Sequence, residues 1–313
     1  MVKTILRKTG YLLLILAGVS LLSFALLHLS GRDPALAVAL RGQSVSEESL
    51  ACLREEMGLN GTMLEQYAGW LRSFLQGDFG YSIYSGQEVA ADLASTLPVT
   101  CALMGLAFVW ILLLGAPMAL YAAYKPGKLF DQSIRVLNIL GICLPTFWLG
   151  YLLLVLFAVR IPLVSVTPKP GIAGLLLPSL ALAVPSMASY IRVFRAALLR
   201  QMDSEYCKIA YTRGLSRKEV LFRHALRNAM PPVVTLLMQY VGYLFVGTVL
   251  VESVFSLDGL GAYLLGCALA SDASALAACL LLAAAVYAVF NMLGELLNRM
   301  LCPWMDRGGA AVQ

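Results

Sequence analysis

The chain has 313 residues, of which 60% are hydrophobic and only 13% are charged, and its mean hydropathy is +0.79. So much apolar surface cannot be buried in one water-soluble core, so the composition excludes an ordinary soluble domain and indicates an integral membrane protein. A net charge of +5 would suggest nucleic acid as the partner of a soluble protein, but in a membrane protein the basic residues report orientation, and we expect no nucleic-acid binding.

The sequence has few of the residues that catalyse reactions at covalent bonds. Seven cysteines stand singly, without the close pairs of thiolate metal sites, and His28 and His224 are the only histidines. We therefore expect no catalytic residues, no metal ligands and no cofactor bound by this chain.

Six runs are long and apolar enough to cross a hydrocarbon core about 30 Å thick as helices of roughly 20 residues. All six should be helical, because an open sheet edge in lipid leaves backbone groups unpaired. Pro117, Pro145, Pro178 and Pro185 lie within or near these runs and predict kinks. The predicted spans are residues 11–29, 98–121, 136–159, 171–190, 232–251 and 275–293.

The first run could be read as a signal peptide, since three basic residues precede it. It is 19 residues long, however, and the SGRDP that follows lacks a small-x-small cleavage site, so we interpret residues 1–30 as a retained signal anchor. With the N-terminus in the cytoplasm, 17 of the 23 basic residues fall on the cytoplasmic side. The positive-inside rule then predicts that both termini are cytoplasmic.

The external segment, residues 31–97, is patterned rather than a simple linker. Residues 44–47 and 62–65 each have capping-box spacing, which predicts two short helices. We expect the segment to form a packed cap on the outer mouth, with contact to a delivery protein as the alternative. The second helix places apolar residues on one face: Met63, Leu64, Tyr67, Trp70, Leu71 and Phe74.

The cytoplasmic segment between the fourth and fifth runs carries nine basic residues and also has helical, amphipathic patterning. Gly214 can end a first helix in a left-handed conformation, and the pair Ser216 and Glu219 predicts a capping box that starts a second one. The predicted product is a helix-turn-helix elbow, ended by Asn228 and by the Pro231-Pro232 pair at the start of the fifth span. A charged elbow that is also amphipathic indicates a protein partner.

This elbow reads EYCKIAYTRGLS over residues 205–216 and LFRHALRNA over residues 221–229. It resembles the EAA loop of ABC-importer permeases and, more narrowly, the dipeptide, oligopeptide and nickel permease family. The resemblance runs nearly from end to end, through residues 18–20, 31–35, 53–59, 66–67, 77–82, 97–100, 145–150, 251–255 and 259–261.

Two departures stand out. Lys208 and Ile209 occupy the positions of the Glu-Ala of the wider superfamily, so that Ala210 alone remains of the triplet. Near the outer end of the sixth span, residues 271–274 read SDAS where the family often has Arg-Asp-x-Pro, which puts an external-mouth role for these residues in doubt.

The resemblance implies an all-α membrane protein with the type I ABC importer permease fold. It implies a permease domain over residues 98–300 with a coupling loop at 203–231, and a cytoplasmic tail over 301–313. Residues 126–129 lack the glycine and hydroxyl of a phosphate-binding loop, so ATP and Mg should bind a separate ATPase. The implied location is the cell (inner) membrane of a bacterium or archaeon. The implied partners are a second homologous permease, two ATPases, an extracytoplasmic binding protein and membrane lipid.

In that family the elbow is a coupling helix that docks in a groove of the ATPase. Basic side chains such as Arg217 would contact the ATPase surface, although at least half of them could simply satisfy the positive-inside rule. The residues that the resemblance assigns to coupling are Ala210, Arg213, Gly214, Leu215, Ser216, Glu219, Arg223, His224, Arg227 and Asn228.

Asn138, Glu252 and Asn291 are the candidates for the translocation pathway, because polar groups in or beside spans are costly unless they are used. For the two asparagines, hydrogen bonding between helices is favoured over substrate contact. Glu252 could line the external gate or lie at an interface. A self-contained secondary transporter or channel would need charged groups at mid-depth of the membrane, and a membrane enzyme would need clustered acids or histidines at one face; the sequence has neither.

The substrate is open between short peptides, nickel and metal chelates. The compact external segment and residues 77–82 favour nickel or a metal chelate slightly. With so few histidines, a metal would pass as a complex or through transient contacts.

Overall fold

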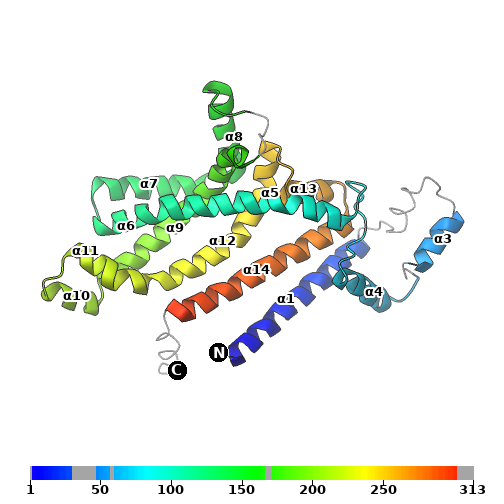
Figure 1. The fold of residues 1–313 in the computed structure, drawn as a ribbon, viewed down its shortest axis with the longest axis horizontal. Helices are drawn as coiled ribbons and strands as arrows, with labels where there is room; N and C mark the ends of the chain where they lie inside the picture. The colour runs from blue at the N-terminus through cyan, green and yellow to red at the C-terminus, as the bar shows by residue number, and fades with distance from the viewer. Residues whose placement is uncertain (1, 30–46, 57–59, 166–170, 302–313) are drawn as a thin grey trace. The chain divides into compact units, whose positions relative to one another are not determined.

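The computed structural model describes residues 2–29, 47–56, 60–165 and 171–301, and within them the chain is helical, with one isolated antiparallel bridge between Tyr81 and Glu88 (Figure 1). The predicted all-α fold is confirmed. The helices are α1 (Val2–Leu29), α3 (Glu47–Glu56), α4 (Met63–Leu75), α5 (Val89–Trp110), α6 (Ala116–Tyr124), α7 (Leu129–Cys143), α8 (Thr146–Leu154), α9 (Ile172–Met202), α10 (Glu205–Thr212), α11 (Arg217–Glu219), α12 (Leu226–Phe255), α13 (Leu260–Leu269) and α14 (Ala273–Leu301), with π-helical segments η1 (Ile111–Gly115), η2 (Val155–Arg160) and η3 (Val220–Ala225).

Four continuous helices are long and apolar enough to cross a membrane: Val89–Tyr124, Ile172–Met202, Arg217–Phe255 and Ala273–Met300. They contain the predicted second, fourth, fifth and sixth spans, and each extends beyond the apolar run because a helix continues through charged turns where hydropathy has already fallen. Within α1, residues Gly10–Ala25 qualify as a shorter apolar helix. A count of six spans therefore stays a prediction.

The predicted third span is broken. Leu129–Cys143 and Thr146–Arg160 meet at a bend of 103°. Pro145 is the cause, since it cannot donate to the preceding turn and it drives Leu144 into extended backbone, with φ −79° and ψ 123°. The kink predicted at Pro145 is confirmed, as a break between two helices.

The Pro231-Pro232 pair differs from its predicted role. We expected it to end the elbow and begin a new helix, but α11, η3 and α12 run on as one helix from Arg217, and both prolines lie inside α12. The prolines remove two helical N–H donors, and the wide π turn of η3 lies just ahead of them. The fifth predicted span and the second arm of the elbow, from Arg217 onward, are therefore one continuous helix.

The chain divides into two compact units, and the first holds residues 1–100 and 258–286. In it the Tyr67 hydroxyl of α4 lies 2.8 Å from Ser20 Oγ of α1, and the rings of Tyr67 and Trp70 lie 5.3 Å and 6.0 Å from that of Phe24. The Thr62–Glu65 capping box is present. The predicted external helix thus packs on the first one; the capping box predicted at 44–47 lies outside the described residues.

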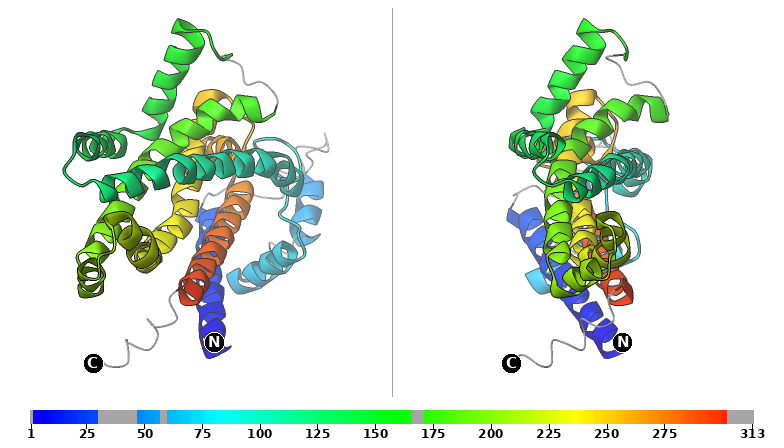
Figure 2. Two further views of the ribbon diagram at one scale, coloured as in Figure 1. Left: turned by 60° about the vertical axis from the view of Figure 1, so that its left-hand side comes forward. Right: turned by 90° about the vertical axis from the view of Figure 1, so that its left-hand side faces the viewer.

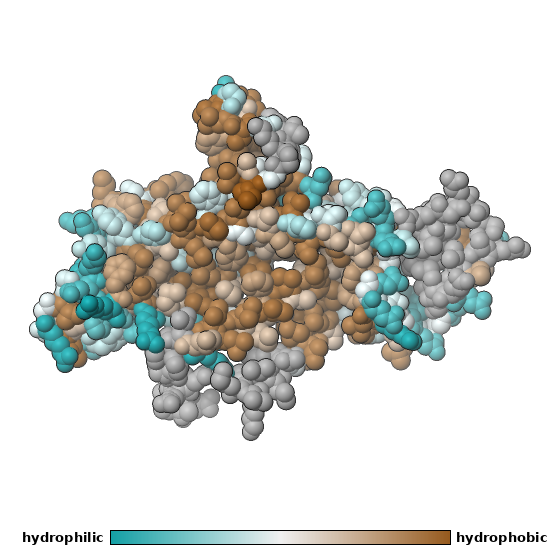
Figure 3. Space-filling model, viewed as in Figure 1, coloured by the Kyte–Doolittle hydropathy of each residue, from teal (hydrophilic) through white to brown (hydrophobic). Residues whose placement is uncertain are grey.

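The second unit holds residues 101–257 and 287–313 and is built on α9 and α12, which run side by side (Figures 1 and 2). Helices α6, α7 and α8 pack on α9. The approach of α7 to α9 is close enough that a Cβ on Gly141 would lie 2.9 Å from Ala188 Cβ. Hydrophilic residues gather at the end of this unit formed by α10 and α11 (Figure 3), as suits a surface that contacts water and not the hydrocarbon core of a membrane.

Candidate functional site

The elbow, which we define as residues 205–228, begins with α10. This helix buries Cys207 and Ala210 and leaves Tyr206 and Ile209 exposed, at 38% and 52% of their surface. Ala210, the one residue left of the family triplet, therefore packs inward. Lys208 Nζ lies 2.8 Å from Glu205 Oε1, and this hydrogen bond and charge raise the pKa of the lysine.

The turn after α10 has the geometry of a Schellman motif. Gly214 has φ +86°, its amide donates to Tyr211 O at 2.9 Å, and the Leu215 amide donates to Ala210 O at 3.3 Å. The left-handed stop predicted at Gly214 is confirmed. Leu215 is half-buried, whereas Arg213, at the C-cap, is exposed.

The second arm begins with the predicted capping box, which is also confirmed. The Ser216 amide and hydroxyl donate to Glu219 Oε2 at 2.9 Å and 2.8 Å, and the Glu219 amide returns a hydrogen bond to Ser216 Oγ at 3.4 Å. Such a reciprocal pair satisfies backbone donors that a helix start leaves open. Both side chains are thus engaged within the elbow.

Segment η3 carries the second arm into α12. Val220, Leu221 and Ala225 are buried, whereas Phe222 is 48% exposed. The remaining coupling candidates lie along this stretch: Arg223 and Arg227 are exposed, His224 and Asn228 are half-buried, and Asn228 Nδ2 donates to His224 O at 3.5 Å.

Three exposed apolar residues were not among the predicted site residues. Tyr206 and Ile209 lie on α10 and Phe222 on η3, and these two elements contact each other. Arg213 and Arg223 are exposed on the same two arms. The sequence did carry the signal, because in helical spacing Tyr206 and Ile209 alternate with the buried Cys207 and Ala210.

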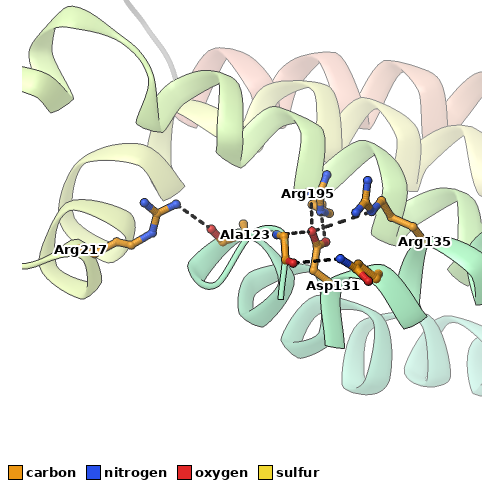
Figure 4. Close-up of polar contacts among 7 residues, drawn as sticks. Ala123, Asp131, Arg135, Arg195 and Arg217 are labelled. Carbon is orange, nitrogen blue, oxygen red and sulfur yellow. Dashed lines mark hydrogen bonds and ion pairs between the residues drawn. The ribbon is translucent and has the colours of Figure 1, made fainter. Parts of the chain in front are cut away.

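One basic side chain of the elbow is engaged within the chain. Arg217 Nε donates to Tyr124 O at 2.8 Å and its Nη2 donates to Ala123 O at 3.3 Å (Figure 4). These are the last two carbonyls of α6, where the helix has no further N–H donors and carries partial negative charge. Hydrogen bonds to a charged group contribute about 1.5–3 kcal/mol, less where water competes, as it does at this exposed arginine.

A buried ion pair lies on the other side of the same turn. Asp131 of α7 is 1% exposed and accepts from Arg195 Nε at 2.5 Å and from Nη2 at 2.7 Å (Figure 4). The Gly127 amide donates to it at 2.9 Å, and Arg135 Nε lies 3.9 Å away. A bidentate guanidinium and a backbone amide satisfy the carboxylate, which burial alone would penalise.

Sequence reasoning missed Asp131 and Arg195. They are 64 positions apart, and no spacing rule joins them. The available signal was weak: Asp131 is a lone acid in the first turn of α7, in a segment predicted to be cytoplasmic whose other charges are basic.

The three pathway candidates lie on three helices. Asn138 of α7 and Glu252 near the end of α12 are buried, at 6% and 0% exposure. Asn291 of α14 donates to Tyr287 O of its own helix at 2.9 Å. The hydrogen bond between helices that we considered for Asn291 is made by Asn298 instead, whose Nδ2 donates to Thr235 Oγ1 of α12 at 2.7 Å.

Potential metal ligands do not gather in the part of the chain that the structure describes, where no three His, Cys, Asp or Glu side chains lie close enough to hold an ion. The site can offer a partner protein a defined shape, apolar contacts and charge.

Comparison with known proteins identifies the family of this chain. The model of the binding-protein-dependent transport system inner membrane component matches residues 115–307, and the N-terminal model of the same systems matches residues 1–104. The "Dipeptide transport system permease protein DppB" of Escherichia coli is 30% identical over 334 residues, covering 97% of this chain and 98% of its own. The "Probable peptide ABC transporter permease protein y4tP" of Sinorhizobium fredii is 30% identical over 307 residues, covering 96% and 97%. This chain therefore belongs to the inner-membrane permeases of binding-protein-dependent transport systems, as a multi-pass subunit of an ABC importer.

Proposed function

We propose that this chain forms half of the pore of an ATP-driven importer of short peptides, and that the elbow docks on a separate ATPase. Membership of the family supports the role in an importer. The names of the relatives, which are peptide and dipeptide permeases, support the substrate class. The lean of the sequence toward nickel finds no counterpart in those names.

The observation that carries the docking is the chemistry of the elbow surface. Tyr206, Ile209 and Phe222 expose apolar area at the hydrophilic end of the unit, where lipid is not there to cover it. Exposed aromatic and aliphatic side chains rimmed by arginine are typical of protein interfaces. The cap and the Schellman turn fix the backbone beneath them, so the surface is preformed.

The rest of the assembly follows as part of the proposal. ATP and Mg bind the partner ATPase, a second homologous permease completes the pore, two ATPases drive it, and a binding protein delivers the substrate from outside. Both termini lie in the cytoplasm. Closure of the ATPases on nucleotide moves the elbow and switches access to the pore.

A pull-down tests the docking. The tagged chain is purified from its native membrane as wild type, as Ile209→Asp/Phe222→Asp, and as the matched control Leu64→Asp/Leu75→Asp, which places two charges on exposed apolar positions of α4. We expect an ATPase with the wild type and the control, and at least about tenfold less with the elbow variant, since hot-spot truncations cost about 2 kcal/mol or more. No ATPase with any form would refute the docking.

Uptake tests the substrate class. Proteoliposomes that hold the co-purified complex and its binding protein are supplied with a labelled dipeptide or with a nickel chelate. ATP-dependent accumulation of the dipeptide supports the proposal, and accumulation of nickel alone would replace peptide by metal.

A further inference from the structure

The turn between α6 and α7, residues 125–128, is held from both sides within one unit. On the α6 side, Arg217 of the elbow binds the carbonyls of Tyr124 and Ala123. On the α7 side, Asp131 binds the Gly127 amide and is itself clamped by Arg195 of α9. The elbow, the turn and α9 therefore form one hydrogen-bonded chain of contacts (Figure 4).

Arg217 suits this connection better than a lysine would. A guanidinium offers several N–H donors in a fixed fork, so it holds two successive carbonyls at once, whereas an ammonium is a single point charge. The helix end that it caps gains from a positive charge as well as from the hydrogen bonds. Arg217 thus uses its Nε and one N–H of its Nη2 within the permease, which fixes the direction of its guanidinium.

We propose that Arg217 is a positioning residue that makes the α6–α7 turn move together with the elbow, an inference that rests on the docking of the elbow proposed above. Displacement of the elbow then reaches the pore by two routes. One is direct, along η3 into α12. The other passes from Arg217 to α6 and α7, and through α7 to the 103° bend before α8.

The test measures co-movement in the whole complex. Spin labels are placed on Lys128→Cys and Lys218→Cys, both exposed, in a cysteine-free background. Their distance is recorded without nucleotide and with the ATPases trapped closed. The proposal expects this distance to stay constant while the distance from Lys218→Cys to an external label on Leu269→Cys changes. A change in the distance between positions 128 and 218 while Arg217 is in place overturns the proposal, so this test needs no variant at Arg217.

Variants at Arg217 provide a second test of the proposal. Arg217→Gln should still co-purify with the ATPase but lose at least about fivefold of the stimulation of ATP hydrolysis by binding protein, the lower end of measured coupling effects. Arg217→Lys should restore part of it, and Arg200→Gln, an exposed basic residue at the end of α9, should match wild type. In Arg217→Gln the distance between the labels should vary with nucleotide.

Different results would contradict the docking of the elbow and the positioning role of Arg217. If the wild-type chain brings down no ATPase, the proposed docking fails and this inference with it. If wild type and Arg217→Gln both bring down the ATPase and respond equally to binding protein, the docking stands and only the role of Arg217 is overturned. Loss of the ATPase in Arg217→Gln would also overturn it, because Arg217 would then be a docking contact.

Discussion

Ser82 Oγ donates a 2.6 Å hydrogen bond to the carboxylate of Asp272, 190 positions later in the chain. Asp272 is fully buried. Its Oδ2, which accepts the bond from Ser82, also accepts from the amides of Ile83 at 2.6 Å and Tyr84 at 3.1 Å. Its Oδ1 accepts from the Ala275 amide at the start of α14 at 3.2 Å. Although Ser271 and Ser274 depart from the family pattern, Asp272 has a definite structural role, because its carboxylate fastens the segment before α5 to the first turn of α14.

Replacing Asp272 by asparagine should release this segment. The asparagine side chain keeps the shape of the aspartate, but its NH2 group presents two donors to a site built from donors. We therefore expect the backbone amides of Ile83 and Tyr84 to exchange with solvent about 100-fold faster, which corresponds to a loss of about 3 kcal/mol in the free energy of local opening. Hydrogen exchange read by mass spectrometry measures this. Asp258→Asn, the same substitution at an exposed carboxylate of the same unit, is the control and should change nothing. Unaltered exchange in Asp272→Asn would mean that the carboxylate does not hold the segment.

The ion pair of Asp131 and Arg195 should be sensitive to loss of one partner. Arg195→Met leaves a buried carboxylate without its guanidinium, and breaking a buried pair in this way typically costs about 3–5 kcal/mol. A lower midpoint of thermal unfolding in detergent is expected, with Arg192→Met, an exposed arginine one turn earlier on α9, near wild type. Adding Asp131→Asn to Arg195→Met should recover part of the loss. Equal midpoints for the two single arginine variants would contradict the role of the pair.

Gly214 and Gly69 should respond to alanine in opposite directions. An added Cβ meets nothing within 4 Å at either position, so only the backbone differs. Gly214 has φ +86°, where alanine is strained by about 1–2 kcal/mol, and Gly69 lies inside α4, where alanine is preferred by about 0.5–1 kcal/mol. Thermal unfolding should show Gly214→Ala below and Gly69→Ala at or above wild type. A neutral Gly214→Ala would show that the elbow turn has another available conformation.

The start of α4 should loosen in acid. Hydrogen bonds from the Thr62 amide, and next from its hydroxyl, hold the pKa of the Glu65 carboxyl below its ordinary value of 4.5. Since the folded form prefers the ionised carboxyl, the stabilisation is complete above pH 4.5 and is lost as the pH falls through the lower folded value. Exchange of the Glu65 and Gln66 amides, normalised to Glu65→Gln at each pH, should accelerate below that window. A ratio that stays flat across it would rule out the carboxylate cap.

What the sequence predicts well here is local. The Ser216–Glu219 box, the Gly214 stop and the Pro145 kink each depend on residues within four positions, so a short window contains the whole cause. The contacts of Asp131 with Arg195, Arg217 with Tyr124 and Asp272 with Ser82 span 64, 93 and 190 positions. Their partners are chosen by how helices pack, which no spacing encodes. The Pro231-Pro232 pair was misread for a related reason: proline statistics favour a helix start, and tertiary context overrides them.

The π turn at η3 gives the elbow an unusual tolerance to changes in length. A π turn accommodates one residue more than an α turn, so deletion of a single residue within 220–225 can be absorbed by conversion to α-helix, and α12 keeps its rotational setting against α9. The same deletion within α12 itself would rotate everything beyond it by about 100°, the angle per residue of an α-helix. Segment 220–225 is thus the place in this long helix where the loss of one residue during divergence would leave the packing of α12 against α9 unchanged.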